Sequence, residues 1–410
     1  MSNTPWKTDK WFTSPWNFAP KVRETLNIPK KLKIHDVSLR DGEQQAGLIF
    51  KKDQKVAIAD RLAELGVHRI EAGMPAVSPQ DEAAIKEIVK RSEAPDSPEI
   101  FAFARCVKDD VKRAHDCGVK GIVIEIPASE HMVEYAYNWT MEKAIELSIE
   151  STALAKELGL YTVFFPIDGT RAEIGWFTSL INKVAEEGHM DALAIVDTLG
   201  GLTPSTVPYL VREIKKVIDK PLEAHFHDDF GMGSANTVLA LVNGAEVAHT
   251  TISSIGERAG NASYEDVAMS LLTMYDYDIG INYDKIYDLS VWLQQVSGFR
   301  VPQNRGIVGD DIFNIESGII SGWYKNCAKD HPLELSPYRA ALTGHPDWQV
   351  VVGKFSGPPT VHIHCEKLGI PVGSPEQVQE VVLKIKARAY EKHGLLSTHE
   401  FESIARSVFC

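Results

Sequence analysis

Residues 121–167 read GIVIEIPASEHMVEYAYNWTMEKAIELSIESTALAKELGLYTVFFPI, two short apolar runs separated by one amphipathic segment. Within that segment Met141, Ile145 and Ile149 recur every four residues among Glu and Lys, and Gly159 stands where a helix would end. The pattern predicts a strand, a helix and a second strand. Because a helix separates them, the two strands cannot form a hairpin and are expected to pair in parallel through a right-handed crossover.

The same arrangement recurs from about residue 31 to 275 and determines the predicted fold class. The runs predicted as strands are LKIHDVSL (32–39), VHRIEAG (67–73), EIFAFAR (99–105), GIVIEIP (121–127), YTVFFPI (161–167), ALAIVDT (192–198), LEAHFH (222–227) and EVAHTTI (246–252). About eight such units close an α/β TIM (β/α)8 barrel. An open doubly wound sheet is the alternative, but no glycine-rich dinucleotide fingerprint follows the first strand.

The regions that flank the barrel differ from it in composition. Residues 1–30 carry five large aromatic side chains, too many for a free tail, so we expect this arm either to cover the bottom of its own barrel or to clasp a second subunit. We predict a catalytic barrel over 31–298 and a smaller appended α+β region over 299–410. Within that region residues 350–365 have strand and turn character, whereas 374–394 read as a helix.

Composition limits the classes of function. The chain has 410 residues, 44% of them hydrophobic, and a formal net charge of −13, which disfavours nucleic acid as a partner. Its five cysteines form no CxxC pair, so neither a disulfide framework nor a zinc ribbon is expected. Neither a signal-peptide core nor an apolar stretch of about 18 residues is present. We therefore expect a cytoplasmic protein without a membrane partner.

The reactive groups of a TIM barrel lie at the carboxyl ends of its strands. The first run is followed by LRDGEQ, which contains Asp41, and the seventh run ends in His225 and His227, whose side chains point the same way on a strand. Closure of the barrel brings Asp41 within reach of both histidines. Two imidazoles and a carboxylate with open coordination positions suit Mg, Mn, Fe, Co or Zn. An HxH pair alone is more often a core or surface feature.

Other polar residues are predicted at the same end of the barrel. Asn261, in the glycine-rich loop after the eighth run, is either an oxygen ligand or part of a plain turn. Arg40 either clamps a carboxylate or polarises a carbonyl, or else pairs structurally with Glu71 or Glu43. Thr198 offers a hydroxyl, although threonine also favours strand ends for local reasons.

Two further pairs are ambiguous. Asp228 and Asp229 either hold the histidines by hydrogen bonds or form a solvated acidic turn. His362 and His364 form a second alternating pair, but no carboxylate has a predictable position near them. We give that second pair little weight as a metal site.

Several of these motifs resemble one enzyme family. LRDGEQ (39–44), DTLGGLTP (197–204), HFHDDFG (225–231), GERAGNA (256–262), EAGMPAVSP (71–79) and GKFSG (353–357) are similar to sequences of the metallolyase-type TIM barrels that include the isopropylmalate, homocitrate and citramalate synthases. The similarity spans roughly residues 31 to 400. Because it covers the appended region, it favours the synthases over the shorter hydroxymethylglutaryl-CoA lyase and aldolase branches.

The resemblance implies an acyltransferase reaction. A divalent metal would bind a 2-oxo acid, an acyl-CoA, most simply acetyl-CoA, would be enolised and attack the ketone, and thioester hydrolysis would follow. The residues implied are Asp41, His225, His227 and Asn261 for the metal, Arg40 for the ketone, Thr198 for the substrate carboxylate, Gln44 for the acyl pocket, Glu173 as acid or base, and Tyr338 as the family's partner tyrosine. A homodimer is also expected.

The sequence departs from the synthases at two positions. Where they usually read HESGIH, this chain reads IESGII, so Ile320 replaces the histidine assigned to thioester activation. Asp228 stands where the synthases commonly have Asn, a feature that the lyase branch shares. A carbon–carbon lyase or aldolase that stabilises an enolate with the same metal is therefore the alternative function.

Overall fold

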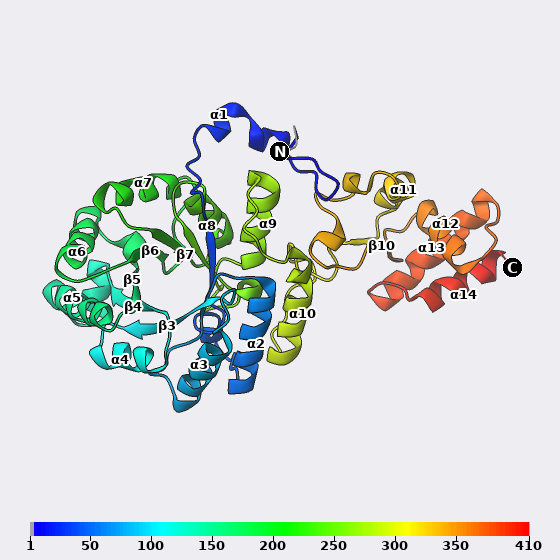
Figure 1. Ribbon diagram of the computed structural model, residues 1–410. Helices are drawn as coiled ribbons and strands as arrows, with labels where there is room; N and C mark the ends of the chain where they lie inside the picture. Colours follow the sequence, from blue (N-terminus) through cyan, green and yellow to red (C-terminus); the bar gives the residue numbers. More distant parts are fainter. Residues whose placement is uncertain (1–3, 410) are drawn as a thin grey trace. The chain divides into compact units, whose positions relative to one another are not determined.

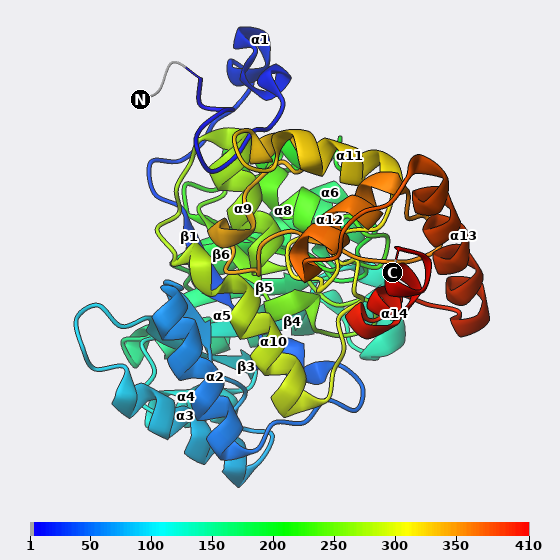
Figure 2. The same ribbon diagram turned by 90° about the vertical axis from the view of Figure 1, so that its right-hand side faces the viewer.

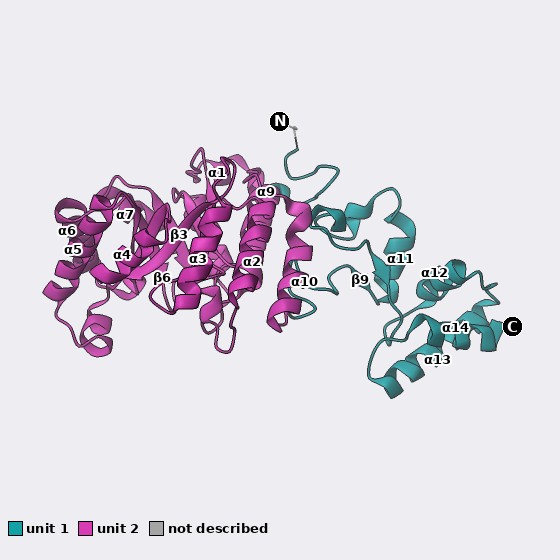
Figure 3. Cartoon of the chain, turned by 60° about the horizontal axis from the view of Figure 1, so that its bottom comes forward, with its two compact units in different colours: residues 1–15, 302–410 teal, residues 16–301 magenta. Residues whose placement is uncertain are grey.

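The computed structural model describes residues 4–409, which fall into two compact units (Figure 3). One unit is Trp16–Val301, and the other combines residues 4–15 with 302–409. The domain limits expected from the sequence, at residues 30 and 298, stay a prediction. No helix within the described residues is both long and apolar enough to cross a membrane.

The unit Trp16–Val301 is a closed barrel of eight parallel strands surrounded by helices (Figure 1). Its strands are β1 (Lys33–Asp36), β2 (Arg69–Glu71), β3 (Glu99–Arg105), β4 (Gly121–Pro127), β5 (Tyr161–Ile167), β6 (Ala192–Asp197), β7 (Leu222–Phe226) and β8 (Val247–Thr250). Its helices are α1 (Pro20–Arg23), α2 (Lys52–Leu65), α3 (Pro79–Arg91), α4 (Lys108–Asp116), α5 (Met141–Glu157), α6 (Ile174–Glu187), α7 (Val207–Val217), α8 (Gly233–Leu241), α9 (Tyr264–Tyr275) and α10 (Ile286–Ser297). The predicted TIM barrel is confirmed, and each strand lies within its predicted run.

Local sequence explains why these elements begin and end where they do. The side chain of Thr140 accepts a hydrogen bond from the backbone N–H of Lys143 and so caps the start of α5. Gly159, just beyond the other end of α5, has a φ of +75°, a backbone conformation that glycine adopts at little cost. The chain can therefore turn sharply into β5.

Strand pairing explains how distant segments meet at the mouth of the barrel. β8 pairs with both β7 and β1, and Asp36 of β1 lies in register with Thr250 of β8. Inside the barrel, Phe103, Val123 and Phe165 belong to one buried apolar cluster. Side chains of alternate residues on each strand point inward, and the loops that follow β1, β7 and β8 are brought together.

The first described residues do not lie where the sequence suggested. In residues 4–15, the backbone N–H of Phe12 donates to the carbonyl of Pro337 at 2.8 Å, so this segment packs on the appended region of the same chain. The following residues contact the barrel, as Arg23 Nη1 donates to the carbonyl of Tyr275 at 3.0 Å. The sequence does not show that residues 4–15 and the residues after them belong to different units, because large aromatic side chains occur in both segments.

The appended region contains two short parallel strands and four helices. They are β9 (Asn314–Ile315), α11 (Gly318–Cys327), β10 (Gln349–Val350), α12 (Pro358–Leu368), α13 (Pro375–Lys392) and α14 (Thr398–Phe409). Helices α12, α13 and α14 contact one another (Figure 2). The apolar core between them includes Val361, Ile385 and Phe401. The strand reading of His362 and His364 is wrong, because two prolines at the first turn start a helix there.

Candidate metal centre

Asp41, His225 and His227 converge at the mouth of the barrel, as the sequence predicted. His225 lies on β7, His227 follows that strand, and Asp41 follows β1. Asp41 Oδ2 lies 3.1 Å from His225 Nε2 and 3.7 Å from His227 Nε2. All three residues are buried, with at most 6% of each exposed. These residues lie far apart in the sequence but close together in space, because β8 pairs with both β7 and β1.

The free polar atoms of this group fit a divalent cation. The two Nε2 atoms lie 3.4 Å apart, so their lone pairs would repel unless a proton or a cation lay between them. Asn261 forms an antiparallel bridge with His227. Among the described residues, Asn261 Oδ1 and Asp41 Oδ1 are buried without a hydrogen-bond partner. Two nitrogen and two oxygen donors are typical ligands of Mn, Fe, Co or Zn.

The protonation states of the ligands also favour a cation. Burial lowers the pKa of His225 to about 3, although Asp41 acts in the opposite direction, so the imidazole is neutral at pH 7. Burial alone would raise the pKa of Asp41, but the charge of Arg40 holds it well below its usual value. A neutral imidazole and an ionised carboxylate are the forms that bind metal.

The loop after β8 orients His227. His227 Nδ1 lies 3.2 Å from the carbonyl oxygen of Gly260, which fixes the ring from the side opposite Asp41. Gly260 has a φ of +88°, and a Cβ there would lie 1.8 Å from the carbonyl oxygen of Ser254. Glycine is therefore required at this position.

The two aspartates that follow His227 stabilise turns. Asp228 Oδ1 accepts from the N–H of Gly233 at 2.7 Å, at the start of α8. Asp229 accepts from Arg258 at 2.8 and 2.9 Å. These contacts support the turn, one of the two alternatives from the sequence, whereas a hydrogen bond from either aspartate to a histidine ring stays a prediction.

Arg40 is held in place by several partners. Its Nε donates to Glu71, and its Nη1 lies 3.1 Å from Asp41 Oδ2 and 3.3 Å from Gln44 Oε1. Its structural partner is thus Glu71 and not Glu43, which pairs with Lys55. Arg40 Nη2 has no hydrogen-bond partner among the described residues. A substrate oxygen could accept from this donor.

Arg40 and Gln44 also line a cavity of about 360 Å³. Leu39, Met74 and Phe50 contribute apolar surface to it, and the buried Lys55 lies in its wall. The cavity opens between the segments that follow β1 and β2. An apolar pocket with a few polar groups is typical of a small-molecule site.

Two other residues expected at the site have local partners. Thr198 Oγ1 accepts from the N–H of Asp168 at 2.7 Å, which fixes the hydroxyl at the carboxyl end of β6. Glu173 is exposed and caps α6, where its side chain accepts from the N–H of Trp176 at 2.8 Å. Hydrogen bonds from the backbone N–H groups of Gly175 and Trp176 lower the pKa of Glu173.

Tyr338 and Ile320 belong to the appended region. The Tyr338 ring lies 5.8 Å from that of Phe313, centroid to centroid. Ile320, at the position of the histidine in the resembling motif, packs against the cluster of Ile315, Val350 and Ile363. The substitution therefore places an apolar contact where a proton-transfer group was expected.

The sequence analysis gave no role to Glu125, a carboxyl group inside the barrel. Glu125 alternates with the inward-facing Val123 on β4 and lies in register with Phe165 of β5. The Phe165 ring is 4.8 Å from that of His225. Tyr137 Oη donates to Glu125 Oε1 at 3.2 Å. The sequence signal that could have indicated Glu125 is a charged residue within an otherwise apolar strand.

The environment of Glu125 raises the pKa of its carboxyl group. Burial raises its pKa, although the charges of Arg40 and Arg105 and the hydrogen bond from Tyr137 act in the opposite direction. A carboxyl with a raised pKa in an active-site cleft is suited to acid–base catalysis.

A closed eight-stranded barrel with a carboxylate and two histidines at its mouth is the architecture of a TIM-barrel metalloenzyme. A profile of the HMGL-like family matches residues 31–292. The chain therefore belongs to the HMGL-like family.

Individual relatives extend the similarity over almost the whole chain. Homocitrate synthase AksA of Methanothermobacter thermautotrophicus is 34% identical over 399 residues, covering 97% of this chain and 98% of the relative. The probable 2-isopropylmalate synthase of Ignicoccus hospitalis is 36% identical, covering 89% of each chain. Among solved structures, the HMG-CoA lyase of Bacillus subtilis shares the fold with a TM-score of 0.59 and 21% identity, covering 67% of this chain and 96% of that chain.

Proposed function

We propose that this protein catalyses a metal-dependent Claisen-type condensation of an acyl-CoA, most simply acetyl-CoA, with a 2-oxo acid. The product is a 2-hydroxy dicarboxylate of the alkylmalate or homocitrate type, and free CoA is released. The observation that carries the proposal is the convergence of Asp41, His225 and His227, with Asn261 bridged to His227 and Arg40 bonded to Asp41. Relatives named as synthases, matched over almost the full chain, support this chemistry.

The proposed roles follow from the donors at the site. A divalent cation held by Asp41, His225, His227 and Asn261 would bind the keto and carboxylate oxygens of the substrate and stabilise charge on the keto oxygen. Arg40 donates to the keto oxygen through Nη2, and its other contacts keep it in place. Gln44 lines the adjoining cavity, which we assign to the acyl group.

Thr198 and Tyr338 keep the roles that the family resemblance implies. Thr198 orients the substrate carboxylate from the end of β6, where its hydroxyl has one remaining hydrogen to donate. Tyr338 serves thioester cleavage as the partner tyrosine.

Two carboxyl groups are candidates for the acid–base step. Glu125 is supported by its raised pKa, its bond to Tyr137 and its place beside Phe165. Glu173, expected from the family resemblance, is exposed and occupied as a helix cap. We favour Glu125 as the group that takes a proton from the acyl carbon and keep Glu173 as the second candidate.

A carbon–carbon lyase is the second candidate function, and one observation favours it. Ile320 packs in an apolar cluster and cannot transfer a proton, so the group expected to activate the thioester is replaced. A lyase needs the same stabilised enolate but no thioester hydrolysis. It would cleave a hydroxy acid or a hydroxyacyl-CoA.

Substrate panels distinguish the two functions. The Mn²⁺-loaded protein is incubated with acetyl-CoA and each of several 2-oxo acids, and free thiol is measured. Thiol release that requires one of the 2-oxo acids supports the condensation. Formation of a 2-oxo acid or an acyl-CoA from a single hydroxy compound, without thiol release, supports the lyase. Metal-loaded protein that turns over neither class contradicts both proposals.

We also propose that the enzyme is a cytoplasmic homodimer. The described cysteines Cys106, Cys117, Cys327 and Cys365 are all unpaired, as is usual for a protein kept in a reducing compartment. The homodimer follows from the family resemblance. Light scattering at micromolar concentration tests it, and a mass of one chain would contradict it.

A further inference from the structure

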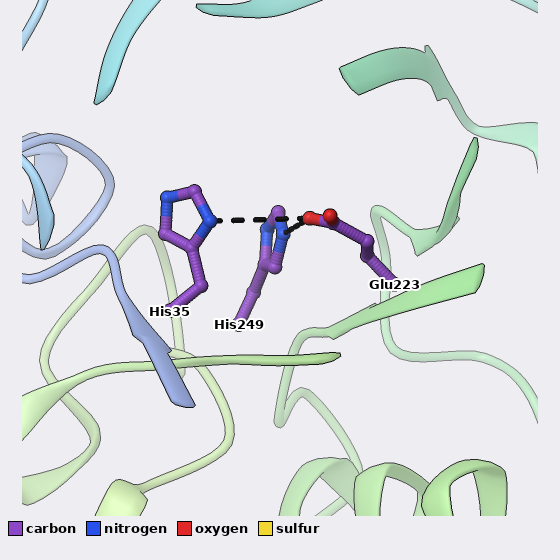
Figure 4. A group of neighbouring side chains, drawn as sticks. All are labelled: His35, Glu223 and His249. Atoms are coloured by element: carbon purple, nitrogen blue, oxygen red, sulfur yellow. Dashed lines mark hydrogen bonds and ion pairs between the residues drawn. The ribbon is translucent and has the colours of Figure 1, made fainter. Parts of the chain in front are cut away.

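A second buried group of ionisable side chains contacts the candidate metal ligands from inside the barrel. His249 on β8 lies with its Nε2 2.7 Å from Oε2 of Glu223 on β7 (Figure 4). On its other side, His249 Nδ1 lies 3.3 Å from His225 Nδ1. Both His249 and Glu223 are at most 1% exposed. His249 therefore links a buried carboxylate to a proposed ligand.

The hydrogen-bond directions follow from the two ends of the chain of contacts. Glu223 Oε1 accepts from Arg69 Nη1 at 2.7 Å, and a carboxylate paired with arginine offers only acceptors, so His249 donates to it from Nε2. A histidine that binds a metal ion through Nε2 carries its ring proton on Nδ1. In His225 that atom faces Nδ1 of His249, which would then be its acceptor.

We propose that Arg69, Glu223 and His249 form a positioning relay that keeps the proton of His225 on Nδ1 and so keeps Nε2 available to a metal ion. His249 is a positioning residue because it acts through His225. The proposal deepens the proposed function and rests on its metal centre. Partners that orient ligand histidines and raise their basicity are a general requirement of metal sites.

His249 and Glu223, together with His35, could instead form a second metal site, since one ligand atom from each lies within 4.8 Å of the others. The distribution of charge argues against it. Glu223 is already paired with Arg69, whose charge offsets that of the carboxylate. In the first group Arg40 faces two carboxylates, Glu71 and Asp41, which leaves one negative charge for a cation.

His35 provides a matched control. It is fully buried, its ring centroid lies 4.5 Å from that of His249, and neither of its ring nitrogens has a hydrogen-bond partner among the described residues. Its Nδ1 is 3.9 Å from Glu223 Oε2, beyond hydrogen-bonding distance (Figure 4). Substitution of His35 therefore removes a neighbouring buried imidazole without breaking the relay.

The first experiment measures the affinity and stoichiometry of Mn²⁺ binding by competition with a chromophoric chelator. The relay predicts that His249→Leu weakens binding by about 10- to 100-fold, whereas His249→Gln, which can accept and donate along the same path, and His35→Leu stay within about threefold of wild type. Unchanged affinity in His249→Leu would overturn the relay. Two ions per wild-type chain, one of them lost in both His35→Leu and His249→Leu, would show a second metal site instead.

The second experiment needs no destabilising variant. Long-range ¹H–¹⁵N spectra of the full-length, Mg²⁺-loaded protein with labelled histidine report which ring nitrogen carries each proton, and His249→Gln assigns the signals. The relay predicts a proton on Nε2 of His249 and on Nδ1 of His225. The opposite tautomer at His249 would overturn it. A wild-type protein that binds no divalent ion would contradict the proposed function and leave the tautomers as a separate result.

Discussion

The guanidinium of Arg40 lies over the ring of Phe103, with 4.1 Å between the guanidinium carbon and the ring centroid. This stacking, together with the bonds to Glu71 and Asp41, fixes the plane of the guanidinium. The unpaired Nη2 is therefore presented in one orientation. Lysine carries its donors on a single nitrogen and has no planar group, so it cannot hold these contacts and present a donor in the same fixed plane.

We therefore expect Arg40→Lys to fold but to lose activity. The expected loss in kcat/KM for thiol release is about 100-fold or more, because a preorganised donor to a developing oxyanion is removed. Arg105→Lys is the matched control, since Arg105 is exposed and its partner is Asp110 in the first turn of α4. Wild-type kinetics in Arg40→Lys would contradict the role assigned to Arg40.

Removal of one imidazole should abolish metal binding. His227→Ala leaves Asp41 and His225 without their third strong ligand, so the metal content measured by plasma mass spectrometry after dialysis should fall from one ion per chain to nearly none. His362→Ala serves as control, because His362 lies on α12 outside the candidate centre. Stoichiometric metal in His227→Ala would refute the proposed coordination.

The two candidate carboxyl groups can be distinguished by isosteric substitution. Glu125→Gln should lower kcat by about 100- to 10,000-fold with little effect on metal content, since it removes proton transfer and leaves the ligands intact. Glu173→Gln should mainly lower the melting temperature slightly, as expected for loss of a helix cap. The reverse pattern of activities would assign the acid–base role to Glu173.

Asp36 should make the protein less stable as the pH rises. Burial raises its pKa to about 7, against an ordinary value of 3.8, although hydrogen bonds from Ser38 act in the opposite direction. The folded state therefore binds more protons than the unfolded state between about pH 4 and 7, and stability declines as the pH rises through this interval. Asp36→Asn cannot ionise and lacks this dependence.

Urea unfolding from pH 5 to 8 measures the effect. The difference in the free energy of unfolding, Asp36→Asn minus wild type, should grow by roughly 3 kcal/mol over that range. Taking the difference cancels groups common to both proteins, such as His35, whose pKa burial lowers to about 4 and which favours stability at higher pH. A difference that does not change with pH would mean that Asp36 titrates normally in the folded state.

Much of the barrel could be predicted because its signals are local. Each strand is a short apolar run, and each helix has its own apolar periodicity and capping residues. The order of the elements therefore follows from the sequence. Parallel closure then places the ends of β1, β7 and β8 together. Asp41 could thus be assigned to the same site as His225 and His227 before any coordinates were considered.

Other features depend on packing that the sequence does not display. Whether Arg40 pairs with Glu71 or Glu43 is decided by which carboxylate faces the interior, and the helical state of His362 and His364 is decided by two prolines and an apolar core. Glu125 was missed because the sequence of a strand that is apolar on both faces does not show which side chains point into the barrel. His249 was missed for the same reason.

The pairing of β8 with β1 sets when the proposed centre can be loaded. Asp41 leaves the ribosome early, whereas His225, His227 and Asn261 emerge only near the end of the barrel sequence. A nascent chain that stops short of β8 has no partner surface on which to gather these donors. Metal binding at the proposed centre would therefore follow synthesis of the whole barrel.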